Sequence, residues 1–244
     1  IIGNNVYAHV PDINDFTAGL KTLLTNEGTI TLEFPHLLQL IQYRQFDTVY
    51  HEHFSYLSFT TVCQIFDQAG LRIFDVEALT THGGSLRIYA CHEDDKRNTQ
   101  PTVVSLLAEE KTFGLSTLST YTGFQCCAEQ IKQELIDFLT GQKRLNKSVI
   151  AYGAAAKGNT LFNYAGISTD LVHLVVDAAT SKQGKFLPGS HIPILAPDQI
   201  TLEKPDFVLI LPWNIADEVM QQQGHIRQWG GKFVTAIPQL KVLP

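Results

Sequence analysis

Short apolar segments alternate with amphipathic helices at the start of the chain. After the apolar residues 1–3, the apolar positions of residues 13–24 recur three and four apart, which predicts a helix with one buried face. Residues 29–34 alternate β-branched and apolar side chains up to Pro35, which predicts a strand. Because a strand, a helix and a strand follow one another, we expect a parallel pair of strands in an α/β domain.

The same kind of pattern returns after residue 146. We expect a helix at 60–69 and strands at 71–77 and 85–91 in the first region, and in the second region strands at 148–152, 171–176, 192–195, 207–211 and 232–236, with a helix ending at Ala165. Short strands that are apolar throughout are typical of a small parallel sheet covered on both faces. The fold class is therefore α/β.

A charged run at 92–98 separates the two regions, and we interpret it as a linker. Residues 103–145 after it have a weak helical periodicity. We therefore divide the chain into a first domain at 1–93, a linker and helical segment at 94–146, and a second domain at 147–244.

Composition narrows the class of protein. With 44% hydrophobic residues the 244-residue chain can form a core, which excludes intrinsic disorder. No apolar run approaches the roughly 20 residues of a membrane-spanning helix, so we expect no membrane partner. The formal net charge is −6 and the Lys and Arg residues are not clustered, which argues against a nucleic-acid partner.

The four cysteines include no Cys-x-x-Cys pair, which disfavours both a disulfide framework and a thiolate metal site. Reduced thiols are typical of a cytoplasmic protein, and we expect that localisation. The chain begins at Ile1 with neither Met nor a basic leader, so we expect it to be a fragment truncated at its N-terminus.

The densest group of reactive side chains is the run Tyr50-His51-Glu52-His53-Phe54-Ser55-Tyr56. A neutral imidazole accepts a proton near physiological pH, and a neighbouring carboxylate orients the ring and stabilises its charge. The run favours a proton-transfer site, with an ordinary polar loop as the alternative. We predict no metal, because His51 and His53 are two residues apart and not four apart as in a helical zinc motif.

Two further candidates belong to the same region. His9 and Asn5 follow the first predicted strand, and ligands of α/β sheets bind at the carboxyl ends of parallel strands. They could face the same crevice as the histidine run, and an exposed loop histidine is the alternative. Arg87, on the strand after the Gly83-Gly84 turn, could pair with a carboxylate or a phosphate.

Residues 152–160, Tyr-Gly-Ala-Ala-Ala-Lys-Gly-Asn-Thr, follow a strand and open a helix, so their N–H groups and the helix dipole could hold a phosphate. Gly153, Lys157 and Asn159 are the candidate residues. Ala155 stands where the dinucleotide pattern has its middle glycine, and its methyl group hinders the approach of a pyrophosphate. Lys157 offers a charge to a diphosphate instead. A sugar nucleotide is therefore favoured over NAD, with a tight turn that binds nothing as the alternative.

Further candidates for contacts with a nucleotide lie at or near the ends of other strands of the second domain: they are Asp177, Lys185, Phe186, His191 and Trp213. Asp177 stands 24 residues after Gly153. The loop 184–193 could cover a nucleotide or form a rigid connection, and Trp213 offers a ring for stacking.

Taken together, these segments resemble the SAM-dependent sugar C-methyltransferases that act on nucleotide-linked keto-deoxysugars. The motifs that carry the resemblance occur in the family's order: Asn4-Asn5-Val6-x-Ala8-His9-Val10-Pro11-Asp12, Tyr50-His51-Glu52-His53-Phe54-Ser55-Tyr56, Gly83-Gly84-Ser85-Leu86-Arg87, Tyr152-Gly153-Ala154-Ala155-Ala156-Lys157-Gly158-Asn159 and Lys182-Gln183-Gly184-Lys185-Phe186-Leu187-Pro188-Gly189.

The resemblance implies three parts in such an enzyme: a cysteine-bound zinc domain, a Rossmann-like SAM-binding domain and a Rossmann-like C-terminal domain that holds the sugar nucleotide. This chain resembles the second half of the SAM domain, over 1–93, and the C-terminal domain, over 147–244. The resemblance therefore implies S-adenosyl-L-methionine as cofactor, with its site incomplete in this chain, and zinc only in the missing N-terminal domain.

The resemblance also implies roles for individual residues. His53 would be the general base that removes the proton beside the ketone of a dTDP-type deoxysugar. Tyr50 would hydrogen-bond the enolate oxygen, and His9 and Glu52 would support the site. Two other functions stay open: a sugar-nucleotide-binding module without turnover, and a nucleotide-sugar oxidoreductase or epimerase. The oligomeric state also stays open.

Overall fold

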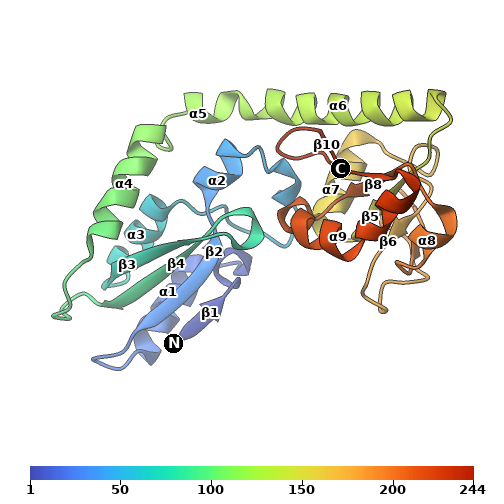
Figure 1. Cartoon of the computed structure of the whole chain (residues 1–244). Coiled ribbons are helices and arrows are strands. Elements are labelled where there is room, and N and C mark those ends of the chain that lie inside the picture. The colour runs from blue at the N-terminus through green and yellow to red at the C-terminus, as the bar shows by residue number, and fades with distance from the viewer. The chain divides into compact units, whose positions relative to one another are not determined.

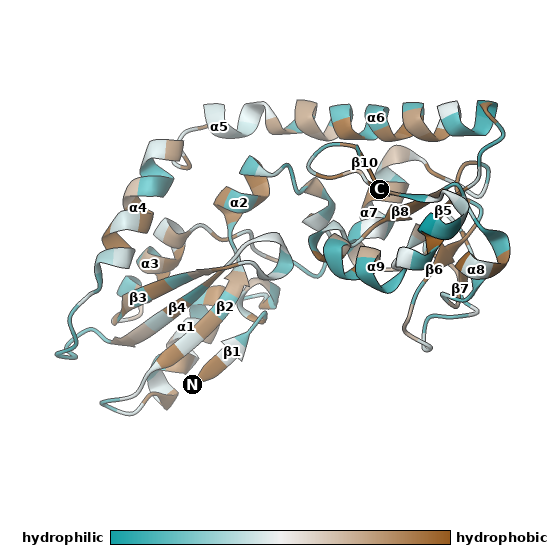
Figure 2. Ribbon diagram, in the orientation of Figure 1, coloured by the Kyte–Doolittle hydropathy of each residue, from teal (hydrophilic) through white to brown (hydrophobic).

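The computed structural model describes residues 1–244, which form two compact units (Figure 1). The first unit contains residues 1–43 and 51–124, and the second contains residues 44–50 and 125–244. The strands of both units are largely hydrophobic, whereas many loops between the elements are hydrophilic (Figure 2).

The first unit is built from these elements: β1 (Ile2–Asn4), η1 (Tyr7–His9), α1 (Ile13–Leu23), β2 (Ile30–Pro35), α2 (Leu37–Gln42), α3 (Phe59–Gln68), β3 (Leu71–Leu79), η3 (Thr81–Gly83), β4 (Ser85–His92), α4 (Pro101–Phe113) and α5 (Ser119–Thr122). Its sheet has the order β1-β2-β4-β3. β1 and β2 are parallel, and α1 connects them, as the sequence pattern predicts. β4 runs antiparallel to both of its neighbours.

The first core lies between this sheet and its helices, and apolar side chains of α1, α3 and α4 contribute to it. α1 begins where the Oδ1 of Asp12 accepts hydrogen bonds from the backbone N–H groups of Asn14 and Asp15. The outer edge of β1 pairs with no strand of the chain, and Ile2 on it is 80% exposed. This edge presents unpaired backbone groups and an apolar side chain.

A buried carboxylate joins α4 to α3. Glu110 of α4 is 1% exposed, and its Oε1 accepts a hydrogen bond from the N–H of Phe59 at 2.6 Å. Its Oε2 accepts from the N–H of Thr60 at 2.8 Å, and the Nε2 of buried His36 lies 2.7 Å from Oε1. Glu110 thus caps the N-terminus of α3 from another helix. Burial opposes its ionisation, but the hydrogen bonds outweigh burial and hold its pKa below the usual value.

The second unit is built from η2 (Phe46–Thr48) and these later elements: α6 (Phe124–Arg144), β5 (Val149–Tyr152), α7 (Ala156–Ala165), β6 (Val175–Val176), β7 (Ile194–Leu195), α8 (Gln199–Glu203), β8 (Phe207–Ile210), η4 (Trp213–Ile215), α9 (Ala216–Gln222), η5 (Gly224–Trp229), β9 (Lys232–Thr235) and β10 (Lys241–Leu243). Its sheet has the order β10-β9-β8-β5-β6-β7. All neighbours are parallel except β10 and β9.

The second sheet has the topology of a Rossmann-like fold. From β5 the chain first moves outward through β6 and β7 and then returns to place β8 on the other side of β5. The carboxyl ends of β5 and β8 therefore mark the switch point, where open parallel sheets bind ligands. The predicted α/β class, with parallel strands, is confirmed.

Two glycines set how closely α7 approaches this point. A Cβ on Gly153, whose φ is +94°, would lie 2.5 Å from the Cδ of Pro212. A Cβ on Gly158 would lie 2.6 Å from the Cδ1 of Leu211. Both distances are below any real contact, so the turn after β5 and the first turn of α7 need glycine to pack beside the end of β8.

Most of the expected elements are confirmed, and the differences have local causes. α2 occupies part of the polar stretch between the first strand pair and the histidine run. β10 is an antiparallel edge strand that the sequence did not predict, and of the strand expected at 171–176 only Val175–Val176 is paired. These pieces are short, so their periodicity was too brief to detect.

The charged run at 92–98, interpreted as a linker, is instead an ordered turn of the first unit. The Arg97 guanidinium donates to both carboxylate oxygens of Asp95, at 2.9 and 2.7 Å, and to the carbonyl oxygen of Gly28 at 2.6 Å. α4, which follows, packs on β3 and α3 within the same unit. The planar fork of Arg97 satisfies several acceptors at once, so charge along the sequence did not indicate exposure here.

We expect Glu110→Ala to lower the free energy of unfolding by about 3 kcal/mol. The substitution leaves His36 and two N–H groups of α3 without their buried acceptor, and removal of one partner from such a cluster costs about 3–5 kcal/mol. The measurement is urea unfolding followed by circular dichroism. Glu109→Ala is the matched control, because Glu109 is exposed on the same helix and should change stability by less than about 0.5 kcal/mol. Equal effects of the two substitutions would contradict the capping role.

Candidate functional site

The histidine run lies beside η1 at the carboxyl end of β1. The backbone N–H groups of Phe54 and Ser55 donate to the carbonyl oxygen of Ala8, at 2.9 and 3.2 Å. The rings of His9 and His53 are therefore close, with 4.8 Å between their centroids. The ring of Tyr56 meets that of His53 edge-on at 6.0 Å. The structure thus brings together two imidazoles that are far apart in the sequence, and His53 is half-buried.

Glu52 contributes through its backbone rather than its side chain. The Nδ1 of His9 lies 2.8 Å from the carbonyl oxygen of Glu52, while the residue itself is exposed. A hydrogen bond to a carbonyl oxygen requires a proton on Nδ1, so it fixes the tautomer of the neutral His9 ring. The expected support of the site by His9 and Glu52 stays a prediction, and in the structure it is the peptide group of Glu52 that contacts His9.

Tyr50 stands three residues before His53 but belongs to the other unit. The segment 44–50 is counted with the second unit, whereas His51 and the residues after it are counted with the first. Tyr50 is half-buried. The boundary between the two units therefore falls inside the histidine run.

Polar residues form a row across the first sheet, near the same end of β1 and β2. Asn4 of β1 is paired with Glu33, Glu33 with Arg87, and Arg87 with Glu77. Arg87 donates to Glu33 at 3.1 Å and to Glu77 at 3.4 Å. The hydrogen bond to Glu33, followed by the interaction with Tyr89, raises the pKa of Arg87. Of the two partners left open for Arg87, a carboxylate or a phosphate, the structure has carboxylates. The backbone N–H of Asn5 donates to the carbonyl oxygen of Glu33 at 2.8 Å.

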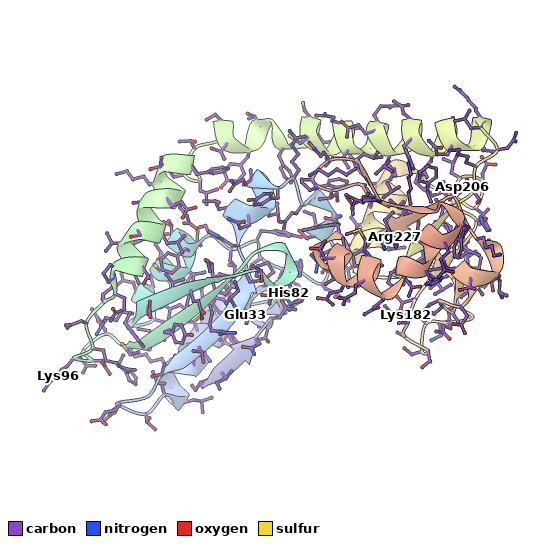
Figure 3. All side chains as sticks on the ribbon, in the orientation of Figure 1. Glu33, His82, Lys96, Lys182, Asp206 and Arg227 are labelled. Carbon is purple, nitrogen blue, oxygen red and sulfur yellow. The ribbon has the colours of Figure 1, made fainter.

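The glycine turn of the second unit is tied to Asp177. The N–H of Ala154 donates to the Oδ2 of Asp177 at 2.7 Å, and Oδ1 accepts from the N–H of Ala179 at 2.8 Å. Lys182, labelled in Figure 3, adds its ammonium at 3.1 Å from Oδ2. Both oxygens are thus engaged within the protein. We expected Asp177 to contact a nucleotide, whereas here it fastens the turn that carries Gly153.

A second cluster lies where β5 and β8 end. The Nζ of Lys157, in the first turn of α7, is 4.5 Å from the ring centroid of Trp213 and 3.2 Å from the Oδ1 of Asn214. Burial lowers the pKa of Lys157, and the charge of Asp47 opposes that shift. Trp213 is half-buried and lies against a lysine. The end of β8 therefore presents both an aromatic ring and a positive charge.

Asp47 completes this cluster, and we did not predict a role for it. It lies in η2, is fully buried, and its Oδ2 accepts a hydrogen bond from the indole Nε1 of Trp213 at 2.8 Å. Its Oδ1 accepts no hydrogen bond from another residue. Burial raises the pKa of Asp47 to about 6, although Trp213 and Lys157 act in the opposite direction. In the sequence Asp47 lies just before the histidine run, and this position is the signal that could have indicated a role for it.

The remaining predicted residues of the second unit are not among the partners named above for Lys157, Trp213 and Asp47. Asn159, on α7, has a buried Oδ1 without a hydrogen-bond partner. Lys185 and Phe186 are exposed, the latter by 60%, and His191 is exposed with a φ of +55°. Exposed rings and cations on a loop are available to a ligand, which keeps these three residues as candidates.

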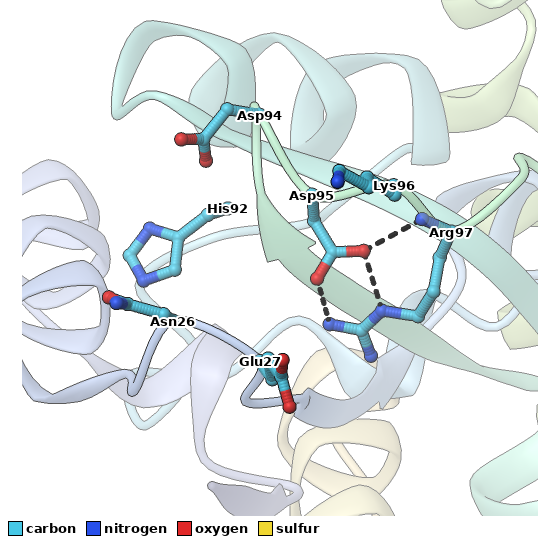
Figure 4. Close-up of a pocket in the computed structure, with 7 residues that line it drawn as sticks. All are labelled: Asn26, Glu27, His92, Asp94, Asp95, Lys96 and Arg97. Carbon is cyan, nitrogen blue, oxygen red and sulfur yellow. Dashed lines mark hydrogen bonds and ion pairs between the residues drawn. The ribbon is translucent and has the colours of Figure 1, made fainter.

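The first unit also has a hollow of about 780 Å³, whose lining residues are drawn in Figure 4. It is lined by Asn26, Glu27, His92, Asp94, Asp95, Lys96 and Arg97. None of the predicted site residues lines it. Its one guanidinium is already bound to Asp95, and the carboxylates of Glu27 and Asp94 lie in the same lining as Lys96, so the hollow is not prepared for an anionic ligand.

The first unit has neither a glycine-rich turn after β1 nor a metal cluster. The polar loop after β1 carries Asn5 and His9, while the first unit has no glycine-rich turn after that strand. No group of three or more His, Cys, Asp or Glu side chains is arranged to hold a metal ion. None of the helices has both the length and the apolar composition needed to cross a bilayer.

Two comparisons with known proteins bear on these sites. The sequence model of the C-methyltransferase C-terminal domain family matches residues 80–238. The chain is also similar to C-methyltransferase NovU of Streptomyces niveus, with 35% identity over 243 residues. That match covers 100% of this chain and 58% of NovU, so the chain spans little more than half the length of this relative.

We expect Asp47→Asn to stabilise the protein at pH 8 and to have little effect near pH 4. Because folding raises the pKa of Asp47 from 3.8 to about 6, the stabilisation from the protonated form is present below pH 3.8 and is lost as the pH rises through 6. The difference between these pKa values corresponds to about 3 kcal/mol, and the uncharged amide avoids this loss. The measurement is the free energy of unfolding in urea at several pH values.

Asp137→Asn is the control for this substitution, since Asp137 is exposed on α6 of the same unit. A gain of the same size in the control would indicate a general effect of charge. A loss of stability at pH 8 in Asp47→Asn would contradict the assigned cost of the buried charge.

Proposed function

Because this chain belongs to the family of C-methyltransferase C-terminal domains, we propose that it carries the catalytic base and the sugar-nucleotide site of a sugar C-methyltransferase. The enzyme would transfer a methyl group from SAM to the carbon beside the ketone of a nucleotide-linked, dTDP-type deoxysugar. The observation that carries the proposal is the pair of adjacent imidazoles, His9 and His53, whose ring centroids lie 4.8 Å apart at the carboxyl end of β1.

In this mechanism His53 is the general base. A carbon beside a ketone becomes a nucleophile when it loses a proton, so a base must lie within hydrogen-bond reach of that carbon. His53 is half-buried against His9 and Tyr56, and the N–H contacts of Phe54 and Ser55 hold its loop in place. Because the Nδ1–H of neutral His9 is directed at a carbonyl oxygen, its ring orientation, and with it the wall against which His53 packs, is defined.

Tyr50 would donate its phenolic hydrogen to the developing enolate oxygen. Positioned donors of this kind stabilise a transition state by about 3–4 kcal/mol. Tyr50 would hold the enolate oxygen, and the imidazolium of His53 would lie beside it. Because the oxygen is occupied, the carbon is the atom that would be methylated. SAM, when bound, would supply the electrophilic methyl group.

The unpaired outer edge of β1 supports a methyl-donor site that is completed by further strands. Its backbone groups are unpaired and Ile2 is 80% exposed, whereas native sheets usually shorten, charge or cover such an edge. We propose that further strands pair with this edge in the active enzyme and bring the glycine-rich turn that SAM needs. The zinc-bound domain implied by the family resemblance would belong to the same additional part.

The second unit would hold the nucleotide diphosphate at its switch point. The N–H groups that open α7 and the ammonium of Lys157 attract an anion, and Trp213 offers a ring beside them. Asn159, Lys185, Phe186 and His191 would add contacts from α7 and the exposed loop.

An oxidoreductase or epimerase is a weaker candidate. A dinucleotide site uses the acidic residue after the second strand to bind ribose, but both carboxylate oxygens of Asp177 are engaged by the protein. The other candidate is a binding module without turnover. Calorimetric titration of a dTDP-sugar, SAM and NAD into the chain tests the oxidoreductase, because nucleotide-sugar binding without NAD binding supports the proposal, and tight NAD binding would contradict it. Exchange of the sugar's α-proton in the full-length enzyme tests the binding module, because a module without turnover would bind the sugar without exchange.

We expect His53→Ala in the full-length enzyme to slow exchange of the sugar's α-proton with solvent deuterium by about 10²–10⁴-fold, the usual contribution of a positioned base. Binding of the substrate should change little, since the base acts on the reacting carbon. The exchange is followed by NMR. His51→Ala is the matched control, because His51 is exposed and two residues away. Undiminished exchange in His53→Ala would assign the base to another residue.

We expect Lys157→Met to weaken dTDP-sugar binding by about tenfold or more, because a charged hydrogen bond contributes about 1.5–3 kcal/mol. Met keeps the length and apolar contact of the side chain over Trp213. Calorimetry gives the dissociation constant. Lys232→Met, at the exposed amino end of β9, serves as the control. An unchanged constant in Lys157→Met would place the diphosphate elsewhere.

A further inference from the structure

The segment 44–50 leaves the first unit and is fastened to the second. The ring of Phe46 lies 5.1 Å from that of Tyr164 on α7. The indole of Trp213 donates to Asp47. Tyr50 is the last residue of this segment, and the chain returns to the first unit at His51. Because only two residues separate Asp47 from Tyr50, whatever holds Asp47 limits where Tyr50 can lie.

A carboxylate is a costly anchor at this position. Asp47 is fully buried, and one of its oxygens accepts no hydrogen bond from another residue. An asparagine could accept the same hydrogen bond from Trp213 without taking a charge out of water. A charge kept under these conditions points to a role for the charge itself.

The charge of Asp47 acts through three groups that contact one another in series. Asp47 of η2 binds the N–H of Trp213, and the ring of Trp213 lies against the ammonium of Lys157 at 4.5 Å. A carboxylate at the N–H draws the indole proton toward itself and makes the ring face more negative, which strengthens its attraction for the ammonium. The carboxylate, the indole and the ammonium therefore hold η2, η4 and α7 together.

We propose that Asp47 is a positioning residue that couples nucleotide binding to the catalytic loop, because its charged hydrogen bond to Trp213 holds the segment 44–50, and with it Tyr50, against the site of Lys157. The coupling rests on the proposed function for the roles of Tyr50 and Lys157. A diphosphate at Lys157 competes with Asp47 for the same ammonium, so arrival of the substrate changes how firmly the segment is held.

The side chains around Asp47 allow its titration to be distinguished from the titration of other residues. Lys157 of α7 is the charged group that acts on it. Trp213 and Asn214, from the turn after β8, do not titrate. Tyr164, on α7 beside Phe46, donates to Glu129, and its pKa is raised further above neutrality. A change in the environment of Trp213 between pH 5 and 7 is therefore assigned to Asp47.

The test uses the complete chain with Trp229→Phe, which leaves Trp213 as the single indole of a protein that has two. We expect the emission of Trp213 to change with one inflection near pH 6, because burial raises the pKa of Asp47 to about 6. Asp47→Asn in this background should remove the inflection, and Asp137→Asn should keep it. A flat profile, or an inflection that survives in Asp47→Asn, would overturn the proposal. If Trp229→Phe does not fold, the comparison of Asp47→Asn with the unsubstituted chain carries the same test.

Addition of dTDP tests the coupling. A bound diphosphate offsets the charge of Lys157, so the inflection should move to higher pH. Binding of dTDP without a shift would overturn the coupling. Absence of dTDP binding would contradict the proposed function and the coupling, while the inflection of the free protein would still decide whether Asp47 holds Trp213.

Hydrogen exchange gives a second readout. Asp47→Ala should speed exchange of the amides in 46–50 by about tenfold or more, since it removes a charged hydrogen bond. Asp47→Asn keeps an acceptor for Trp213 and should give a lower rate than Asp47→Ala, and the amides of α1 should not change in either variant. Equal rates in all three proteins would overturn the anchoring role.

Discussion

A buried carboxylate needs hydrogen-bond donors to replace the water that it has lost. Four buried carboxylates hold the functional segments of this chain in place. Glu110 caps α3 from α4, and α3 directly follows the histidine run. Glu33 binds Arg87 and Thr81 at one end of the first sheet. Asp177 fastens the glycine turn of the second unit through the N–H of Ala154. Asp47 holds the segment that leads to Tyr50.

These four groups differ in how completely their charge is met. Hydrogen bonds outweigh burial for Glu110, whose pKa is low, and both oxygens of Asp177 are bonded. Asp47 has one bonded oxygen and a pKa raised to about 6. Well-satisfied carboxylates act as structural ties. An incompletely satisfied one stores destabilisation, which proteins retain where a site depends on it.

Patterns within a short stretch of chain were sufficient for most of the fold. The periodicity of 13–24 and the alternation of 29–34 predicted α1 and β2, and the apolar strands after residue 146 predicted the parallel sheet. The motif around Gly153 predicted a turn into a helix, because glycine is required where α7 passes the end of β8. By contrast, the charged residues at 92–98 led us to predict a linker, and this prediction was wrong. Arg97 donates hydrogen bonds to Asp95 in an ordered turn.

The sequence by itself determined the α/β class, the order of the elements and the family resemblance, because these depend on local propensity, hydrophobic period and the residues of short motifs. Only the tertiary structure decided which polar groups meet. His9 meets His53 and the backbone of Glu52, Asp177 turns inward to the glycine loop, and Asp47 reaches Trp213 far along the chain. Contacts between distant residues depend on how strands and loops pack in three dimensions, and the spacing of residues along the chain does not specify this packing.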